Sequence, residues 1–178
     1  MKLNKIASVF ALAMGMAAMG VNAAEIADQG KGTIKFTGTI IDAPCSINPD
    51  SSNQEIDLGQ VAAHSLENEG RSTVQPFYIN LENCSLDEDK ANTVSITFNG
   101  SEVDGTDLLG ITGSASGAGV AMGVATGERI KLEEKTLVQN LTEGDNVLAF
   151  SAWLQGIKDV KAKPGEFSAL TTFSMQYD

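Results

Sequence analysis

The sequence is poor in the side chains that most catalytic and metal sites require. Its 178 residues include one histidine, two cysteines and one tryptophan. Any Ser-His-Asp arrangement would have to use His64, and a zinc site needs several nitrogen or sulfur ligands that the chain does not offer. The segment GSASG at 113–117 has Ala115 where a nucleophile elbow needs serine. We therefore expect no enzyme activity, no metal site and no cofactor.

Basic residues are also scarce. Twelve lysines and arginines stand against 23 aspartates and glutamates, which gives a formal net charge of −11. No basic cluster offsets this charge, and an acidic surface repels nucleic acid and anionic membranes. The acidic run LDEDK at 86–90 lacks the glycine and the spaced ligands of a calcium loop, so we interpret it as a solvated turn. Nucleic-acid binding is not expected.

Long hydrophobic runs are absent except at the N-terminus. Lys2 and Lys5 precede an apolar stretch at 6–21, and Val-Asn-Ala at 21–23 is an acceptable cleavage site. We interpret residues 1–23 as a signal peptide and not as a membrane anchor, because the apolar core is short for a span and lies at the extreme N-terminus. No later segment has the roughly 20 apolar residues that a second span would need. The mature chain would then be exported without a membrane span, and loss of the two lysines would change its formal net charge to −13.

Both cysteines lie in the part of the chain that would be exported. In an oxidising compartment, two cysteines favour a single disulfide between Cys45 and Cys84. The alternative is a pair of buried free thiols.

Period-2 alternation of apolar residues predominates in the mature chain and predicts β-strands. The expected strands are residues 33–41, 54–61, 74–84, 92–100, 119–124, 129–138, 146–156 and 167–177. Short strands separated by turn-rich segments are typical of an antiparallel β-sandwich, and an immunoglobulin-like sandwich is one such fold. Residues 60–68 favour a short helix, and the small residues of 110–123 favour a flexible loop, a bulged edge strand or both. No linker marks a second large domain.

The two ends of the mature chain are unusual for a self-contained sandwich. Six residues near the N-terminal end share one parity, so an extended chain would place them on one face: Gly30, Gly32, Ile34, Phe36, Gly38 and Ile40. The last predicted strand alternates in the same way through six residues: Phe167, Ala169, Thr171, Phe173, Met175 and Tyr177. Almost no polar tail follows this strand.

Several spaced motifs resemble a known family. They are GTIKFTGTIIDAPCSI at 32–47, DLGQV at 57–61 and INLENCS at 79–85, together with Gly165 and the penultimate Tyr177. This pattern is similar to the pilins of the chaperone–usher pathway, especially the major rod subunits of P-type and type 1 fimbriae from Gram-negative bacteria. It spans essentially the whole mature chain.

The resemblance implies an all-β fold, an incomplete immunoglobulin-like β-sandwich that a donor strand from a neighbouring subunit completes. A periplasmic chaperone would fill the open groove first, and an outer-membrane usher would exchange it for the next subunit. The implied partners are identical subunits and tip or adaptor subunits. The implied location is the cell surface, reached through the periplasm, where the assembled fimbria supports adhesion.

The resemblance also assigns roles to residues. The donor extension is expected at 24–37 and the pilin domain at 38–178. Within the extension, Ile34 and Phe36 would fill deep subsites, and Gly30 or Gly32 would mark the point where strand exchange begins. The groove and its chaperone contacts would involve five C-terminal residues: Gly165, Phe173, Met175, Tyr177 and Asp178. The carboxylate of Asp178 would be anchored by basic residues of the chaperone.

Two alternatives remain open from the sequence. The chain could be a minor fimbrial adaptor subunit instead of the major rod subunit. It could also be a self-contained secreted sandwich, such as a carbohydrate-binding module with Trp153 or Tyr78 as a stacking platform, although alternation with its neighbours favours a core position for Trp153. Pairing of residues 24–36 with their own chain would favour the self-contained sandwich.

Overall fold

The computed structural model describes residues 30–86, 92–103, 105–136 and 138–178. The expected signal peptide at 1–23, the first part of the expected donor extension and most of the LDEDK run lie outside the described residues. The chain divides into two compact units, Met1–Ile40 and Ile41–Asp178. No helix in the described part of the chain is long and apolar enough to cross a membrane.

The described end of the first unit forms no strand. Residues 30–42 belong to no helix or strand, and every residue from 30 to 40 is exposed. The strand expected at 33–41 is therefore absent from this chain on its own. A single strand is not stable in water, because its main-chain donors and acceptors need a neighbouring strand.

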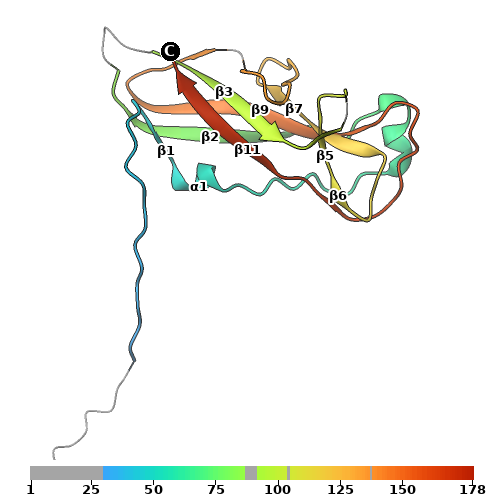
Figure 1. Ribbon diagram of the computed structural model, residues 1–178, viewed down its shortest axis with the longest axis horizontal. Coiled ribbons are helices and arrows are strands. Elements are labelled where there is room, and N and C mark those ends of the chain that lie inside the picture. Colours follow the sequence, from blue (N-terminus) through green and yellow to red (C-terminus); the bar gives the residue numbers. More distant parts are fainter. Residues whose placement is uncertain (1–29, 87–91, 104, 137) are drawn as a thin grey trace, which may run out of the picture. The chain divides into compact units, whose positions relative to one another are not determined.

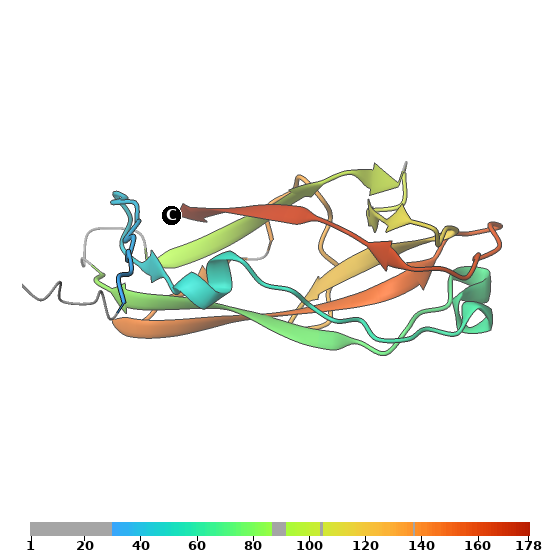
Figure 2. The same ribbon diagram turned by 90° about the horizontal axis from the view of Figure 1, so that it is seen from below.

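The second unit is an antiparallel β-sandwich, as the alternation predicted (Figure 1). Its larger sheet has the spatial order β1-β2-β9-β7-β5-β4. The bounds of these strands are Ser46–Ile47, Gln75–Cys84, Gly144–Gly156, Ala118–Val124, Leu108–Gly110 and Glu102–Val103. The smaller sheet has the order β11-β3-β8, with bounds Thr171–Tyr177, Thr93–Gly100 and Gln139–Asn140. Figure 2 shows β3 and β11 in one layer and β2 and β9 in the other.

Short elements close the ends of the sandwich. Strands β6 (Thr112–Gly113) and β10 (Phe167–Ser168) pair with each other. Helix α1 spans Pro49–Ser52, and the Asn48 side chain caps it by accepting a hydrogen bond from Asp50 N. The 3₁₀ segment η1 spans Ala63–Glu69, close to the helix expected at 60–68, and is interrupted by non-helical backbone at Glu67 and Asn68.

The core lies between the two sheets and consists of the inward residues of the long strands. Its largest fully buried hydrophobic side chains are Phe98, Ile79, Leu81, Ile96, Leu148 and Val94. The Phe98 ring meets the Phe150 ring edge-on with centroids 5.3 Å apart, and Phe77 stacks on Phe150 at 5.4 Å. The most strongly alternating segments therefore supply most of the core. The strands expected at 74–84, 92–100, 119–124 and 146–156 are confirmed as β2, β3, β7 and β9.

Other strand predictions need correction. The strand expected at 167–177 is split into β10 and β11. Residues 54–61 form no strand, because the Asp57 side chain accepts a hydrogen bond from Gly59 N at 2.8 Å and Gly59 has a φ of +69°. The described residues of 129–138 form no regular strand either. They make isolated main-chain bonds to two strands: Ile130 N donates to Met122 O of β7 at 2.9 Å, and Glu133 N donates to Phe98 O of β3 at 2.8 Å.

The flexible loop or bulged edge strand expected at 110–123 is wrong for the second half of this segment, where the strand expected at 119–124 is correct. This second half belongs to β7, which lies between β5 and β9 and is buried at all seven positions. A Cβ on Gly119 would lie 2.8 Å from the Leu108 side chain, and one on Gly123 would lie 3.2 Å from the Trp153 ring. The small residues are therefore required for close packing at a central strand.

Candidate functional site: an open apolar sheet edge

Strand β11 is the outer strand of the smaller sheet. It pairs with β3 along one edge, from Thr171 opposite Gly100 to Tyr177 opposite Val94. Its other edge has no partner strand within the described ranges. The far edge of β3, by contrast, is covered by β8 and by Thr136 N, which donates to Ile96 O at 2.8 Å. Among the described residues, β3 is therefore covered on both edges, whereas β11 is covered on one edge.

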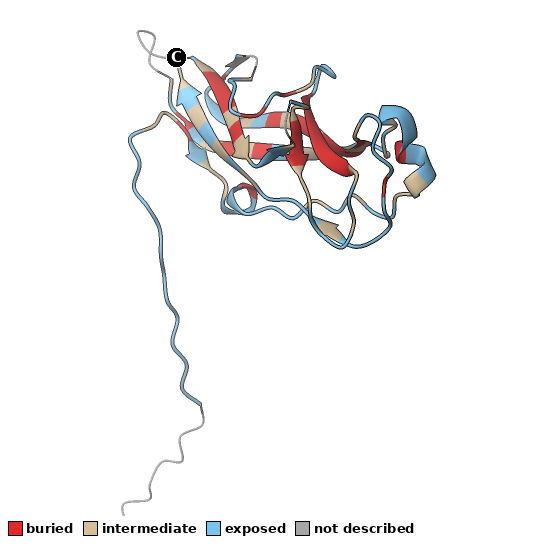
Figure 3. Ribbon diagram, turned by 45° about the vertical axis from the view of Figure 1, so that its right-hand side comes forward, coloured by how far each residue is buried: buried red, intermediate tan, exposed pale blue. Residues whose placement is uncertain are grey.

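The two faces of β11 differ in polarity. Thr172, Ser174 and Gln176 are exposed on the outer face, whereas Phe173, Met175 and Tyr177 are half-buried and pack against the core. Figure 3 shows this alternation along β11, beside the largely buried β3. We call the row formed by Phe173, Met175 and Tyr177 the open edge.

Further apolar side chains from the other layer and its connections pack against the same core and are also only half-buried. They include Ile47 of β1, Leu58 and Val61 of the segment before η1, Phe77 of β2 and Phe167 of β10. The core is thus incompletely covered by residues from several elements, in addition to the open edge. The sequence alone does not point to a functional role for these five residues, since only the packing identifies them.

The outer edge of the larger sheet is protected in a way that the β11 edge is not. Beside β2, Gln54 Nε2 donates to Tyr78 O at 2.8 Å, and Asn80 N donates to Ser51 Oγ at 2.9 Å. Pro76 lies on the same strand and has no N–H to offer. Proteins commonly block unpaired strand edges in these ways to prevent unwanted pairing. Among the described residues, no contact of this kind lies along the free edge of β11, so this edge is open to pairing.

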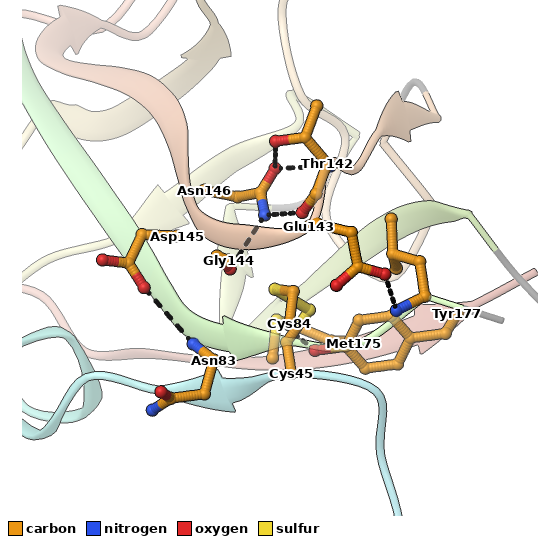
Figure 4. The surroundings of a disulfide bond; sticks show 11 residues. Cys45, Asn83, Cys84, Thr142, Glu143, Gly144, Asp145, Asn146, Met175 and Tyr177 are labelled. Atoms are coloured by element: carbon orange, nitrogen blue, oxygen red, sulfur yellow. Dashed lines mark hydrogen bonds between the residues drawn. A yellow bond between two sulfur atoms is a disulfide. The ribbon is translucent and has the colours of Figure 1, made fainter.

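The disulfide lies at one end of the open edge. Cys45 and Cys84 are bonded, as expected, and both are buried in the core cluster against which Met175 and Tyr177 pack (Figure 4). Burial raises the pKa of the Tyr177 phenol above its usual value. The phenol Oη lies 3.9 Å from Met175 Sδ.

Asp178 is tied to the start of β3. Its main-chain oxygen accepts hydrogen bonds from Thr93 N at 3.3 Å and from Thr93 Oγ1 at 2.8 Å. Lys135 Nζ lies 3.9 Å from Asp178 Oδ2. These contacts fix the end of β11 in register with β3.

Gly165 does not lie on β11. It precedes β10, and a Cβ at this position would lie 2.5 Å from Ser114 Oγ and from Ala115 N. The same Ser114 Oγ accepts a hydrogen bond from Glu166 N at 3.0 Å. The described contacts therefore give Gly165 a packing role beside β6.

The expected donor residues are all exposed. Ile34 and Phe36 expose 79% and 89% of their surface, and no atom lies within 4 Å of where a Cβ on Gly30 or Gly32 would be. Ile40 has the same parity, is fully exposed and is the last residue of the first unit. The donor extension expected at 24–37 stays a prediction, and the apolar alternation continues beyond it to Ile40.

The residues considered for catalysis, sugar binding or metal binding do not form such sites in the described part of the chain. His64 is exposed on η1. Trp153 is only 7% exposed and packs with Leu108 and Ala121, so it offers no stacking platform for a sugar. Within the described ranges, no three His, Cys, Asp or Glu side chains group in a way that could hold a metal ion.

Comparison with known proteins agrees with this arrangement. The "Major MR/P fimbria protein" of Proteus mirabilis is 46% identical, and the match covers 99% of both chains. The "Fimbria A protein" of Serratia marcescens is 43% identical, again over 99% of both chains.

Solved structures show the same fold. A chaperone–usher pilus studied for rod uncoiling has a TM-score of 0.76 at 32% identity, with 84% of this chain and 97% of that chain covered. The P pilus rod subunit PapA has a TM-score of 0.69 at 29% identity, with 76% and 100% covered. These neighbours are pilins, which confirms the immunoglobulin-like sandwich. The model of the family described as "Fimbrial protein" matches residues 34–178, and the chain therefore belongs to the fimbrial protein family, with the chaperone–usher rod subunits as its relatives.

Proposed function

We propose that the chain is a structural, non-enzymatic subunit of a surface fimbria and polymerises by donor-strand exchange. The observation that supports this most strongly is the open edge: a strand with an apolar inner face, half-buried and unpaired on one side. An apolar strand edge of this kind would aggregate unless another strand covered it. The names of the relatives favour the major rod subunit over an adaptor.

Residues 30–40 have the properties of the covering strand. Their apolar members Ile34, Phe36 and Ile40 are exposed and share one face in an extended chain. Residues two apart in a strand are separated by about 6.6 Å, which is also the spacing of the inward side chains of β11. A neighbouring subunit could therefore set these side chains against Phe173 and its neighbours without a break in register.

The contact is expected to be strong because it completes a core. Burial of Ile34 and Phe36 would contribute about 1.5 to 3 kcal/mol each, with main-chain hydrogen bonds in addition. Binding that stabilises the folded acceptor also raises its apparent stability. A fibre linked in this way would be continuous without a covalent bond between subunits.

Assembly requires temporary protection of the open edge. We infer that a periplasmic chaperone supplies a strand to β11 and that an outer-membrane usher exchanges it for residues 24–37 of the next subunit. Either Gly30 or Gly32 would lie where exchange begins, because a glycine leaves part of the groove unfilled. On the chaperone, basic residues would hold the Asp178 carboxylate, and Gly165 would mark the start of the C-terminal region that the chaperone contacts.

The test is electrophoresis of surface-extracted protein in SDS, with and without boiling. We expect a ladder that collapses to one monomer band only on heating, and Phe36→Asp should abolish the ladder. Thr37→Asp is the matched control, because residue 37 has the opposite parity and should leave the ladder intact. A single monomer band from the unaltered protein without boiling would contradict the proposal.

A further inference from the structure

The methionines of the chain differ sharply in their surroundings. Four of the six lie within residues 1–23, so removal of the expected signal peptide leaves Met122 and Met175. Met122 lies on β7, which is buried at all seven positions, and is 4% exposed. Met175 lies on β11 and is half-buried, on the strand whose second edge is uncovered. Of these two methionines, the one on the open edge is therefore the one that solvent can reach.

The Met175 sulfur lies in apolar and aromatic surroundings. Phe173 and Tyr177 follow it on the same face of β11, and Ile96, its partner on β3, is 1% exposed. The Tyr177 hydroxyl lies 3.9 Å from Met175 Sδ and donates a hydrogen bond to it. Figure 4 shows these two side chains beside each other, near the disulfide. A thioether suits this place because it is polarizable and needs no strong hydrogen bond.

A peroxide converts a thioether to a sulfoxide by transfer of one oxygen atom. The sulfur lone pair attacks one peroxide oxygen, so that an S–O bond forms and the O–O bond breaks. The leaving hydroxide takes the proton of the transferred oxygen, and one sulfide and one hydrogen peroxide give one sulfoxide and one water. Free thiols would compete for the oxidant, but Cys45 and Cys84 are bonded to each other and the described part of the chain has no free cysteine.

The sulfoxide does not suit the place that Met175 occupies. Its oxygen is polar and needs a hydrogen-bond donor once water is removed. Water can solvate this oxygen while β11 is uncovered, whereas a covering strand would exclude the water. Among the described contacts, the Tyr177 hydroxyl is the one donor at the sulfur. Because burial of an incompletely satisfied polar group costs free energy, oxidation should weaken binding of a strand to β11.

We propose that Met175 is a peroxide-sensitive modification site that determines whether a subunit can accept a donor strand. This inference rests on the proposed function, because the strand that the sulfoxide would exclude is the donor strand. Before β11 is covered, a peroxide reaches the sulfur and the sulfoxide prevents assembly. After β11 is covered, the strand shields the sulfur and the assembled subunit resists the same oxidant. Enzymatic reduction of the sulfoxide restores the subunit.

The first measurement locates the oxidation in the full mature subunit. Assembled fibres, and dilute subunits refolded from them, are treated with the same concentration of hydrogen peroxide, and mass spectrometry follows the gain of one oxygen at each methionine. In the dilute subunit, we expect Met175 to oxidise about ten times faster than Met122, because susceptibility follows exposure. In the fibre, Met175 should be about as slow as Met122. Equal rates for Met175 in the fibre and in the dilute subunit would overturn its protection by assembly.

The second measurement tests the effect on strand binding. Calorimetric titration with a peptide of residues 24–40 compares the dilute subunit before oxidation, after oxidation and after treatment with methionine sulfoxide reductases. We expect oxidation to weaken binding by about tenfold and the reductases to restore it. Met175→Leu has no oxidisable sulfur, so peroxide should leave its affinity unchanged from its own untreated value. Met122→Leu is the matched control and should stay as sensitive to peroxide as the unaltered subunit.

The outcomes separate the two proposals. No binding of the peptide to the untreated subunit would overturn donor-strand exchange and this inference with it. Equal binding before and after oxidation of Met175 would overturn the inference alone, and so would loss of binding in peroxide-treated Met175→Leu. The comparison of untreated, oxidised and reduced forms uses the unaltered sequence, so it decides the question even where Met175→Leu does not fold.

Discussion

Strands β3 and β11 are neighbours in register, yet their inward side chains are buried to different extents. Phe98, Ile96 and Val94 of β3 are each 1% exposed, whereas the residues paired with them, Phe173, Met175 and Tyr177, are only half-buried. Both rows are largely apolar, with the Tyr177 phenol as the one polar group, so composition does not explain the difference at Phe173 and Met175. The difference lies in the neighbouring strands. In the described structure β3 has a strand on each side, and β11 has a strand on one side only. The comparison locates a missing strand beside β11.

The largest effect is expected from removal of the proposed donor strand. Deletion of residues 24–37 should leave a folded domain that can receive a strand but cannot donate one. Mixed with the unaltered subunit, it should end chains and shorten fibres in proportion to its share. Fibre length in electron micrographs measures this effect, and fibres of normal length from the deletion protein alone would contradict it.

Truncation of the paired phenylalanines sharpens the comparison between the two strands. Phe98→Ala should destabilise the domain by about 3–5 kcal/mol in any state, as is usual for a buried phenylalanine. Phe173→Ala should cost about half as much in the isolated domain and approach the full cost once a strand covers β11. Urea unfolding with and without a peptide of residues 24–40 measures both. Equal costs for Phe173→Ala in the two states would mean that the peptide does not cover this side chain.

The disulfide should stabilise the end of the open edge. It closes a loop with a sequence separation of 39 residues, so Cys45→Ser with Cys84→Ser should lower the free energy of unfolding by about 4 kcal/mol. Because Tyr177 packs nearby, the double variant should also bind the peptide more weakly than its stability alone would predict. Calorimetric titration of the variant at low temperature, where it is still folded, checks the second effect.

The smallest effect concerns the Tyr177 phenol. Its pKa is raised in the folded state, so the unfolded chain ionises first as the pH rises. Stability should therefore fall as the pH rises above about 10, the ordinary pKa of tyrosine. Tyr177→Phe should remove part of this fall, and thermal melts between pH 8 and pH 11 would show it. An identical pH dependence in the variant would contradict the assignment.

The sequence predicts the fold well where alternation is strong and long. β2, β3 and β9 follow from apolar residues at every second position, and the disulfide follows from the cysteine count. Residues 54–61 alternate too, but a local Asp57–Gly59 turn competes with the strand. The described residues of 129–138 make isolated bonds to β7 and then to β3 without regular pairing, which depends on long-range packing and not on local pattern.

The candidate site could be predicted only in part. The sequence shows by alternation which residues share one face of a strand: Ile34 and Phe36 at one end, and Phe173, Met175 and Tyr177 at the other. It does not show that β11 is an unpaired outer strand, because strand order depends on which distant segments pair. The sequence also could not predict that Leu58 and Val61 pack against the core or that Gln54 protects the edge of β2. Both depend on packing between elements.

The most direct test of the account is a cryo-electron microscopy map of the native fibre at side-chain resolution. We predict continuous density along the outer edge of β11 that fits residues 30–40 of a neighbouring subunit, with Ile34 and Phe36 directed towards Phe173 and Met175. Density along that edge from the subunit's own chain, or an edge that no strand covers, would contradict donor-strand exchange.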